Sequence, residues 1–247
     1  MYKDKTFLAI IPARSGSKGI IDKNIREINH KPLMAYTVEA CKRSGIFDDI
    51  LVSTDSVKYA KIAERFGASV PFLRPEKLAS DQASSIDVIL HVLEKMEHLG
   101  KTFDCFMLLQ PTSPLRNETH MIESAHILAE NHADSVISIC KSEPTSYLTI
   151  RLTDEGMVKV PFSDKKQVRR QDIRPEYRLN GAIYLSLTSY FMKHKSFYEG
   201  RTLPYFMNAF DSVDIDDDFQ FKIAELLLLD KELSNPAKKP SLNFHPL

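Results

Sequence analysis

The feature that most constrains this chain is an alternation of short apolar runs with longer amphipathic stretches. The runs have the length of β-strands, and several are apolar throughout, which is typical of strands covered on both faces. They are Phe7–Ile11, Ile50–Ser53, Ser69–Phe72, Phe103–Leu109, Ser135–Cys140 and Ala182–Ser186. The alternation predicts an α/β fold whose central sheet is mostly parallel and carries helices on both faces.

The stretches between these runs place apolar residues at helical spacing. The first predicted helix contains Leu33, Thr37 and Cys41, and Gly45 follows it as a stop signal. The other predicted helices are Ser56–Phe66, Ser85–Leu99, Glu118–Glu130 and Phe219–Leu233. Sheets of this kind bind ligands at the carboxyl ends of their strands. We therefore expect functional side chains just after Ile11, Ser53, Leu109 and Ser186.

Charge and composition exclude two classes of partner. Lys and Arg number 33, as do Asp and Glu, so the chain lacks the basic field expected of a nucleic-acid-binding protein. No apolar run approaches the roughly 20 residues that a membrane helix needs, so no membrane partner is expected. Cys41, Cys105 and Cys140 lie in apolar stretches without a Cys-x-x-Cys motif. We interpret them as buried, reduced thiols of a cytoplasmic protein.

Residues 141–179 interrupt the alternation. This segment is polar, contains proline and is rich in Lys and Arg, which suits a small subdomain, an active-site flap or a dimerisation arm. The rest of the chain gives no sign of a second domain, so we expect one domain over residues 1–247. Residues 235–247 contain three prolines and little pattern, which predicts a loose tail.

A basic loop rich in glycine and serine follows the first predicted strand. It reads Pro12-Ala13-Arg14-Ser15-Gly16-Ser17-Lys18-Gly19 and continues to Lys23-Asn24. Its small residues let backbone N–H groups approach an anion, while Arg14, Lys18 and Lys23 supply positive charge. The loop matches neither the Walker pattern nor the dinucleotide-binding glycine pattern. We predict that it holds a triphosphate; a solvated basic loop is the structural alternative.

The densest acidic stretch lies between residues 211 and 219. If its apolar residues face the core, Asp214 and Asp216 share the opposite face of an extended segment. Two carboxylates there can hold a divalent cation such as Mg²⁺ together with substrate phosphates. Helix capping is the alternative, because acids just before a helix complement its dipole. Capping suits Asp216 or Asp217 but does not explain Asp214.

Six motifs in order resemble the N-acylneuraminate cytidylyltransferases, also called CMP-sialic acid synthetases. The first is the basic loop and the last is Asp-Ser-Val-Asp-Ile-Asp at 211–216. Between them come Val52-Ser53-Thr54-Asp55, Leu73-Arg74-Pro75 with Leu78-Ala79-Ser80-Asp81 and Ser84-Ser85, Leu108-Leu109-Gln110-Pro111-Thr112-Ser113-Pro114-Leu115-Arg116, and Asn180-Gly181-Ala182-Ile183-Tyr184. Together they cover roughly residues 7 to 225, and six ordered motifs are far more specific than any one of them.

The resemblance implies a Rossmann-like three-layer sandwich and a Mg²⁺-dependent nucleotidyltransferase. Members join CTP to a nine-carbon α-keto sugar acid and release pyrophosphate. The residues implied to bind the nucleotide are Arg14, Ser17, Lys18, Lys23, Asn24, Arg74, Asp81 and Ser85. The resemblance also assigns Gln110 and Arg170 to the sugar, Arg170 to its carboxylate, and makes Asp214 and Asp216 the metal ligands. Arg14, Lys18, Lys23 and the two aspartates would be the catalytic set.

The resemblance further implies a homodimer in which residues 141–179 are exchanged between subunits, so that each completes the other's site. Phosphoryl-type transfer needs positioning and charge neutralisation more than covalent help, so no general base is named. Blander roles are open for three residues. Gln110 could form a turn before Pro111, Arg74 could pair with a nearby acid, and Arg170 could belong to a solvated basic arm.

One departure from the family pattern concerns the acceptor. Some relatives carry a second basic residue after a His-Pro segment, where this chain reads Glu143-Pro144-Thr145-Ser146. N-acetylneuraminate, legionaminic acid and pseudaminic acid are therefore all acceptors to consider. An enzyme acting on Kdo or on a sugar phosphate is a less favoured alternative. A non-catalytic nucleotide-binding protein is a remote one, because the charged residues of the site are intact.

Overall fold

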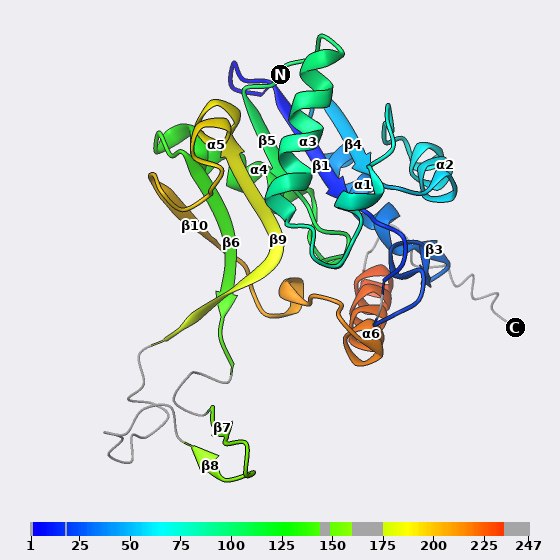
Figure 1. Cartoon of the computed structure of the whole chain (residues 1–247), viewed down its shortest axis with the longest axis vertical. Coiled ribbons are helices and arrows are strands. Elements are labelled where there is room, and N and C mark those ends of the chain that lie inside the picture. The colour runs from blue at the N-terminus through cyan, green and yellow to red at the C-terminus, as the bar shows by residue number, and fades with distance from the viewer. Residues whose placement is uncertain (1, 18, 144–148, 160–174, 235–247) are drawn as a thin grey trace, which may run out of the picture.

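The computed structural model describes residues 2–17, 19–143, 149–159 and 175–234, and its centre is a six-stranded sheet (Figure 1). The strand order is β10-β6-β9-β5-β1-β4. In chain order the strands are β1 (Phe7–Pro12), β4 (Asp49–Ser53), β5 (Cys105–Leu108), β6 (Ser135–Lys141), β9 (Tyr177–Leu187) and β10 (Thr202–Phe206). β1 pairs in parallel with β4 and β5, and β6 in parallel with β10, whereas β9 is antiparallel to both neighbours. The expected mostly parallel sheet is thus confirmed.

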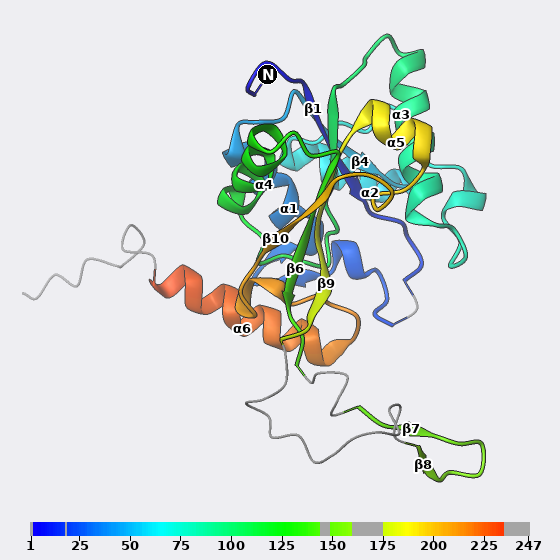
Figure 2. The same ribbon diagram turned by 90° about the vertical axis from the view of Figure 1, so that its left-hand side faces the viewer.

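Helices cover both faces of this sheet, as the alternation predicted (Figure 2). One layer contains α1 (Leu33–Ser44), α2 (Val57–Phe66) and α4 (Glu118–Glu130), and the other contains α3 (Ser85–His98) and α5 (Thr188–His194). β1 shows why: Ala9 packs toward the first layer and Ile10 toward the second, since successive strand residues face opposite sides. Both are fully buried, which accounts for the unbroken apolar run.

A third apolar cluster fixes the elements near the carboxyl ends of the strands. There α6 (Asp218–Ser234) packs through Phe221 and Leu228 against Ile28, Leu33 and neighbouring residues. Ile28 belongs to a two-stranded ribbon of β2 (Glu27–Ile28) and β3 (Lys31–Pro32). Short 3-10 helices complete this region: η1 (Lys23–Ile25), η2 (Glu76–Leu78) and η5 (Phe210–Ser212).

Several predicted element boundaries are confirmed by capping. Ser56 accepts a hydrogen bond from the Tyr59 N–H and begins α2, and Ser84 caps α3 through the Asp87 N–H. Gly45 ends α1 in the left-handed conformation, with φ of 65°. These are the polar starts and glycine stops from which the sequence predicted helices.

Three predictions about strands need correction. The run Ser69–Phe72 is not a strand; only Ser69 forms an isolated bridge, with Leu51, because Pro71 removes a backbone donor. The edge strand β10 was not predicted, since Pro204 interrupts its pattern, and proline is tolerated at sheet edges. β9 was predicted only as Ala182–Ser186, but it begins at Tyr177 within the polar segment.

The described part of residues 141–179 includes a small antiparallel pair, β7 (Arg151–Leu152) and β8 (Val158–Lys159). Both views place this pair away from the six-stranded sheet (Figures 1 and 2). The predicted loose tail, 235–247, lies outside the described residues. The three cysteines are free and buried, as expected. Among the helices of the described segments, none is long and apolar enough to span a membrane.

Candidate active site

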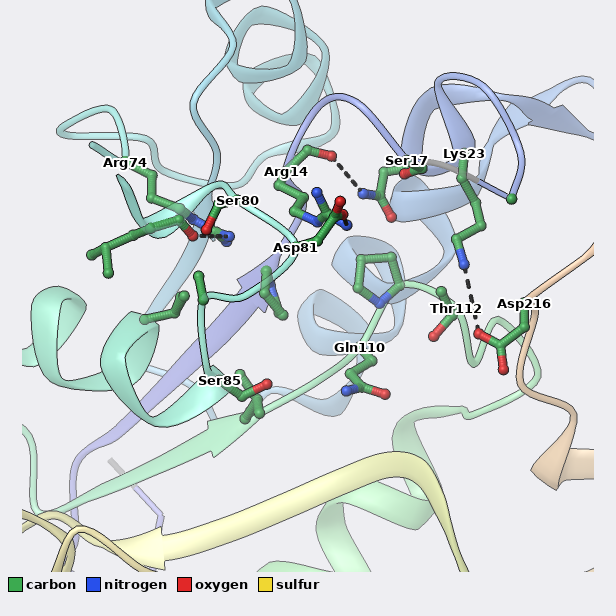
Figure 3. Close-up of a pocket in the computed structure, with 18 of the residues that line it drawn as sticks. Arg14, Ser17, Lys23, Arg74, Ser80, Asp81, Ser85, Gln110, Thr112 and Asp216 are labelled. Carbon is green, nitrogen blue, oxygen red and sulfur yellow. Dashed lines mark hydrogen bonds and ion pairs between the residues drawn. The ribbon is translucent and has the colours of Figure 1, made fainter. Parts of the chain in front are cut away.

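A cavity of about 570 Å³ opens at the carboxyl ends of β1 and β5 (Figure 3). Most of the residues predicted for the site line it. They are Arg14, Ser17, Lys23, Asn24, Arg74, Asp81, Ser85, Gln110, Asp214 and Asp216. Lys18 and Arg170, which were also predicted, lie outside the described residues. Residues from distant parts of the chain are therefore brought together at the edge of the sheet where a parallel α/β fold binds its ligands.

The basic loop, residues 13–25, is held at its start and its end by hydrogen bonds to backbone carbonyls. The Ala13 N–H donates to the Ser53 carbonyl at 2.9 Å, and the Asn24 amide donates to the Arg14 carbonyl at 3.0 Å. Gly19 lies so close to the acidic segment that an added Cβ would stand 2.6 Å from the Asp216 carbonyl oxygen. The loop and the acidic segment are thus in direct backbone contact.

Two arginines of the cavity are held by acceptors in the structure. Arg14 donates to Asp81 Oδ1 at 2.6 Å and to the Ala79 carbonyl at 3.2 Å. Arg74 is buried and donates through Nη2 to the Ser53 carbonyl at 2.7 Å. Burial lowers the pKa of Arg74 to about 10, still high enough to keep it charged at neutral pH. Figure 3 shows Arg74, Arg14 and Asp81 on one side of the cavity.

Lys23 lies on the opposite side, where the basic loop meets the acidic segment (Figure 3). Its Nζ donates to the Ile215 carbonyl at 2.7 Å and lies 3.8 Å from Asp216 Oδ1. The lysine side chain is 15% exposed, whereas the Asp216 side chain is 80% exposed. Lys23 is therefore fixed in direction, while Asp216 is open to a ligand.

Asp214 has the environment of a ligand for a cation. Its Oδ1 is buried and has no hydrogen-bond partner among the described residues. Burial raises the pKa of Asp214 and the charge of Asp216 adds to the shift, against an opposing hydrogen bond from the Thr112 hydroxyl. A buried carboxylate oxygen without a partner is costly unless a cation compensates it. The described residues contain no group of three or more His, Cys, Asp or Glu side chains that could hold a metal ion, so Mg²⁺ would also need phosphate or water oxygens as ligands.

The remaining acids of this stretch have structural roles. Metal binding and helix capping, the two interpretations made from the sequence, therefore apply to different residues. Asp217 caps α6, because its Oδ1 accepts from the N–H groups of Phe219 and Gln220 at 2.8 and 3.1 Å. Asp218 pairs with Arg26 at 2.8 Å. Capping therefore applies to Asp217 and not to Asp216, which lines the cavity.

Gln110 and Asp214 lie directly against the backbone of Gly181. A Cβ at Gly181 would stand 2.5 Å from Gln110 Oε1 and 3.1 Å from Asp214 Oδ2, and its φ is 72°. Below them Arg116, which is 2% exposed, donates to the carbonyls of Gln110 at 3.0 Å and Ala182 at 2.8 Å. The turn after β5 and the start of the core part of β9 are thereby joined.

Sequence reasoning gave no role to several residues that shape the site. Arg116 and Asn180 were only parts of motifs, yet both are buried, and Asn180 accepts from Ser138 Oγ at 2.6 Å and donates to Ser212 Oγ at 3.0 Å. Thr112 was likewise unassigned, although it lines the cavity and bonds Asp214. Only Asn180 had a local signal, because it comes just before the apolar run that begins at Ala182; Arg116 and Thr112 stand among polar residues and prolines.

Comparisons with known proteins agree with this arrangement. The chain matches the cytidylyltransferase family over residues 8–235. It is 39% identical over 218 residues to an N-acylneuraminate cytidylyltransferase of Escherichia coli O18:K1:H7, an alignment that covers 88% of this chain and 51% of that protein. The chain thus spans about half the length of that curated relative.

Two further matches have lengths closer to this chain. A CMP-N,N'-diacetyllegionaminic acid synthase of Legionella pneumophila is 36% identical over 227 residues, with 90% of this chain and 95% of that protein covered. The solved structure of CMP:2-keto-3-deoxy-manno-octonic acid synthetase complexed with CTP shares the fold. Its TM-score is 0.69 at 14% identity, over 92% of this chain and 99% of that one. From the family match and these relatives, the chain belongs to the cytidylyltransferase family.

Proposed function

We propose that this chain transfers CMP from CTP to a nine-carbon α-keto sugar acid of the N-acylneuraminate type. The observation that supports this most directly is the shared cavity of a basic loop and two aspartates. In the transfer, the anomeric hydroxyl oxygen bonds to the α-phosphorus, the bond from that phosphorus to the leaving oxygen breaks, and pyrophosphate departs. The hydroxyl proton passes to solvent. Relatives of this chain include enzymes named for such transfers.

The residues of the cavity suit the charge that develops in this step. Arg14 and Lys23 lie on opposite sides of the cavity, so both can reach one triphosphate (Figure 3). Phosphoryl transfer is accelerated chiefly by positioning and by stabilising charge on phosphate oxygens. Arg74, Asp81 and Ser85 line the cavity and are proposed to contact cytosine and ribose. Gln110, which lies with Asp214 against Gly181, is proposed to contact the sugar acid.

Mg²⁺ is part of the proposal, and Asp214 and Asp216 are the residues that would hold it. The partnerless Asp214 Oδ1 and the exposed Asp216 carboxylate fit an oxygen-ligated cation. Bound Mg²⁺ would neutralise phosphate charge and polarise the α-phosphate. We expect Asp216→Asn to abolish turnover while leaving the melting temperature unchanged. Near-normal activity of that variant would contradict the metal assignment.

The main test is pyrophosphate release with CTP and Mg²⁺, comparing N-acetylneuraminate, di-N-acetyllegionaminate and Kdo as acceptors. A clear preference for one nine-carbon acid would support the class and identify the acceptor. Di-N-acetyllegionaminate is the second candidate, because the legionaminic acid relative is 36% identical and is covered over 95% of its length. Release with none of the three acids, from folded protein that still binds CTP, would contradict the proposed activity.

A homodimer and a cytoplasmic location complete the proposal. Large apolar side chains are exposed on and beside the polar segment, including Leu152, Val158, Tyr177 and Phe206. A second copy would cover them, because exposed apolar surface of this kind marks association sites. The free buried thiols support a reducing compartment.

Mixing two variants, at a sugar-acid concentration too low for Arg170→Ala to turn over, tests both the dimer and the role of Arg170. If residues 141–179 complete the partner's site, Arg170→Ala and Asp216→Asn subunits together form dimers with one intact site. An equal mixture should then recover about a quarter of the wild-type rate. Arg170→Ala alone should raise the KM of the sugar acid far more than that of CTP. No recovery in a mixture shown to exchange subunits would contradict the shared site.

A further inference from the structure

Asp55 is hydrogen-bonded to the basic loop from outside the cavity. It follows β4, and both of its carboxylate oxygens accept from Ser15. Oδ1 accepts the backbone N–H at 2.8 Å and Oδ2 accepts the hydroxyl at 2.5 Å. Asp55 is not among the residues that line the cavity, whereas Arg14, the neighbour of Ser15, is one of them. The contact therefore acts on the loop and not on a ligand.

The charge of Asp55 makes this placement informative. Burial pushes the pKa of Asp55 upward, but the two hydrogen bonds from Ser15 outweigh it and hold the pKa below its usual range. The carboxylate is therefore ionised at neutral pH, close to a loop that is built for an anion. Coulomb repulsion alone would make such a charge unfavourable for triphosphate binding. Any favourable effect of Asp55 on triphosphate binding must therefore come from the conformation that it imposes on the loop.

That geometry is a fixed turn at the start of the loop. Asp55 occupies the Ser15 N–H, and the next residue, Gly16, has a left-handed φ of 72°. Successive N–H groups around such a residue form a concave anion-binding nest. With Ser15 fixed by Asp55 and the Ala13 N–H bonded to Ser53, the following N–H groups are oriented before a ligand arrives.

We propose that Asp55 is a positioning residue, which holds the basic loop in the conformation that receives the triphosphate of the nucleotide. This inference rests on the proposed function, because it concerns the same loop and ligand. It predicts a result opposite in sign to simple electrostatics: removing this negative charge weakens the binding of a polyanion instead of strengthening it.

Inorganic triphosphate is the probe, since it reports on the loop without cytosine, sugar or turnover. Its affinity should be measured by calorimetry at fixed ionic strength for the wild type, Asp55→Ala and Asp55→Asn. Asp55→Ala should bind about tenfold more weakly or worse, because it loses two charge-assisted hydrogen bonds. Asp55→Asn keeps one acceptor for the Ser15 N–H and should recover part of that loss. The KM of CTP should follow the same order.

Asp104 provides a matched control at the opposite end of β1. Its Oδ2 accepts from the Thr6 N–H at 2.8 Å and the Thr6 hydroxyl at 2.9 Å, the same pair of donors that Ser15 offers. Asp104→Ala should lower the melting temperature as Asp55→Ala does, yet leave triphosphate affinity unchanged. Equal or tighter binding in both Asp55 variants would overturn the positioning role.

The two proposals fail in different ways. If the wild type releases pyrophosphate and Asp55→Ala binds triphosphate normally, only the role of Asp55 is wrong. If the wild type binds inorganic triphosphate but releases no pyrophosphate with any sugar acid, the proposed function is wrong and the loop inference is still decided by the affinities. A wild type that releases pyrophosphate from CTP but binds no inorganic triphosphate would overturn the loop inference alone.

Discussion

Gly181→Ala is the substitution that most directly tests how the site is packed. The new Cβ would stand 2.5 Å from Gln110 Oε1, where an ordinary contact begins at 3.4 Å, so the amide would have to retreat by about 0.9 Å. Asp214 Oδ2, at 3.1 Å, would have to move by about 0.3 Å. Both side chains belong to the cavity, so a small backbone change reaches the proposed sugar and metal ligands together.

Two separate effects are expected from this substitution. The left-handed φ of 72° costs an alanine about 1–2 kcal/mol, which corresponds to roughly 2–8 °C in melting temperature for a chain of this size. The displaced side chains affect catalysis more strongly, because misplacing a reacting group by about 1 Å can cost on the order of 100-fold in rate. We therefore expect kcat/KM to fall by about two orders of magnitude in protein that remains folded.

Gly100→Ala separates these effects. Gly100 has a φ of 75° with no atom within 4 Å of the added Cβ, and it lies just beyond the C-terminal end of α3, at the opposite end of the sheet from the cavity. It should lose the same stability and no activity. The assay is steady-state pyrophosphate release with each substrate varied in turn, beside thermal melting of both variants. If Gly181→Ala retains kcat/KM within about threefold of Gly100→Ala, close packing at Gly181 does not position the site.

Three other predictions use different contacts. Gly19→Ala places a Cβ 2.6 Å from the Asp216 carbonyl oxygen, so a Mg²⁺ titration of activity should shift to higher concentration; an unchanged midpoint would contradict this. Arg116→Met removes the donor that bonds the Gln110 and Ala182 carbonyls and should lower the free energy of unfolding in urea by about 2–4 kcal/mol, and a change below about 0.5 would refute it. Burial raises the pKa of Asp211, but hydrogen bonds from His120, Lys231 and Asn208 outweigh it and hold the pKa well below its usual range. Asp211→Asn should therefore destabilise the fold at pH 5–8, and the difference from wild type should begin to shrink below about pH 4, where the Asp211 carboxylate of the unfolded chain takes up a proton; a pH-independent difference would exclude this role.

Local patterns in the sequence were sufficient to predict the elements that are determined by residues close together in the chain. The unbroken apolar run of β1 predicted a strand covered on both faces, and it is buried between two helix layers. Ser56 and Gly67 predicted the limits of α2 for the same reason that they cap it. The basic loop and the aspartates were found because charge and small residues are dense there, although their roles in binding are still proposals.

The failures have a common physical cause, because each depends on a neighbour that is distant in the chain. Ser69 meets β4 for one residue only; Pro71 ends the pairing, but that Ser69 pairs with Leu51 at all depends on a strand that is separate in the chain. β10 is a strand because β6 offers it an edge, despite Pro204. Arg116 resembled a surface charge in the sequence, yet its partners are the carbonyls of Gln110, in the turn after β5, and of Ala182, in β9.

The cations of the cavity show how a chain with no net charge can offer a site to a polyanion. Arg14 is bonded to Asp81, and Lys23 to the Ile215 carbonyl beside Asp216, so neither extends freely into water. These contacts fix the direction of each charge in advance, and preorganised charges stabilise a ligand without reorganising when it arrives. Asp81, however, accepts the hydrogen bond from Arg14 Nη2 that a phosphate would use. Binding of a phosphate would therefore replace the Asp81 carboxylate as the partner of Arg14. Under the proposed function this arrangement favours a ligand with several closely spaced negative charges, because such a ligand replaces the internal contact of Arg14 and reaches Lys23 as well.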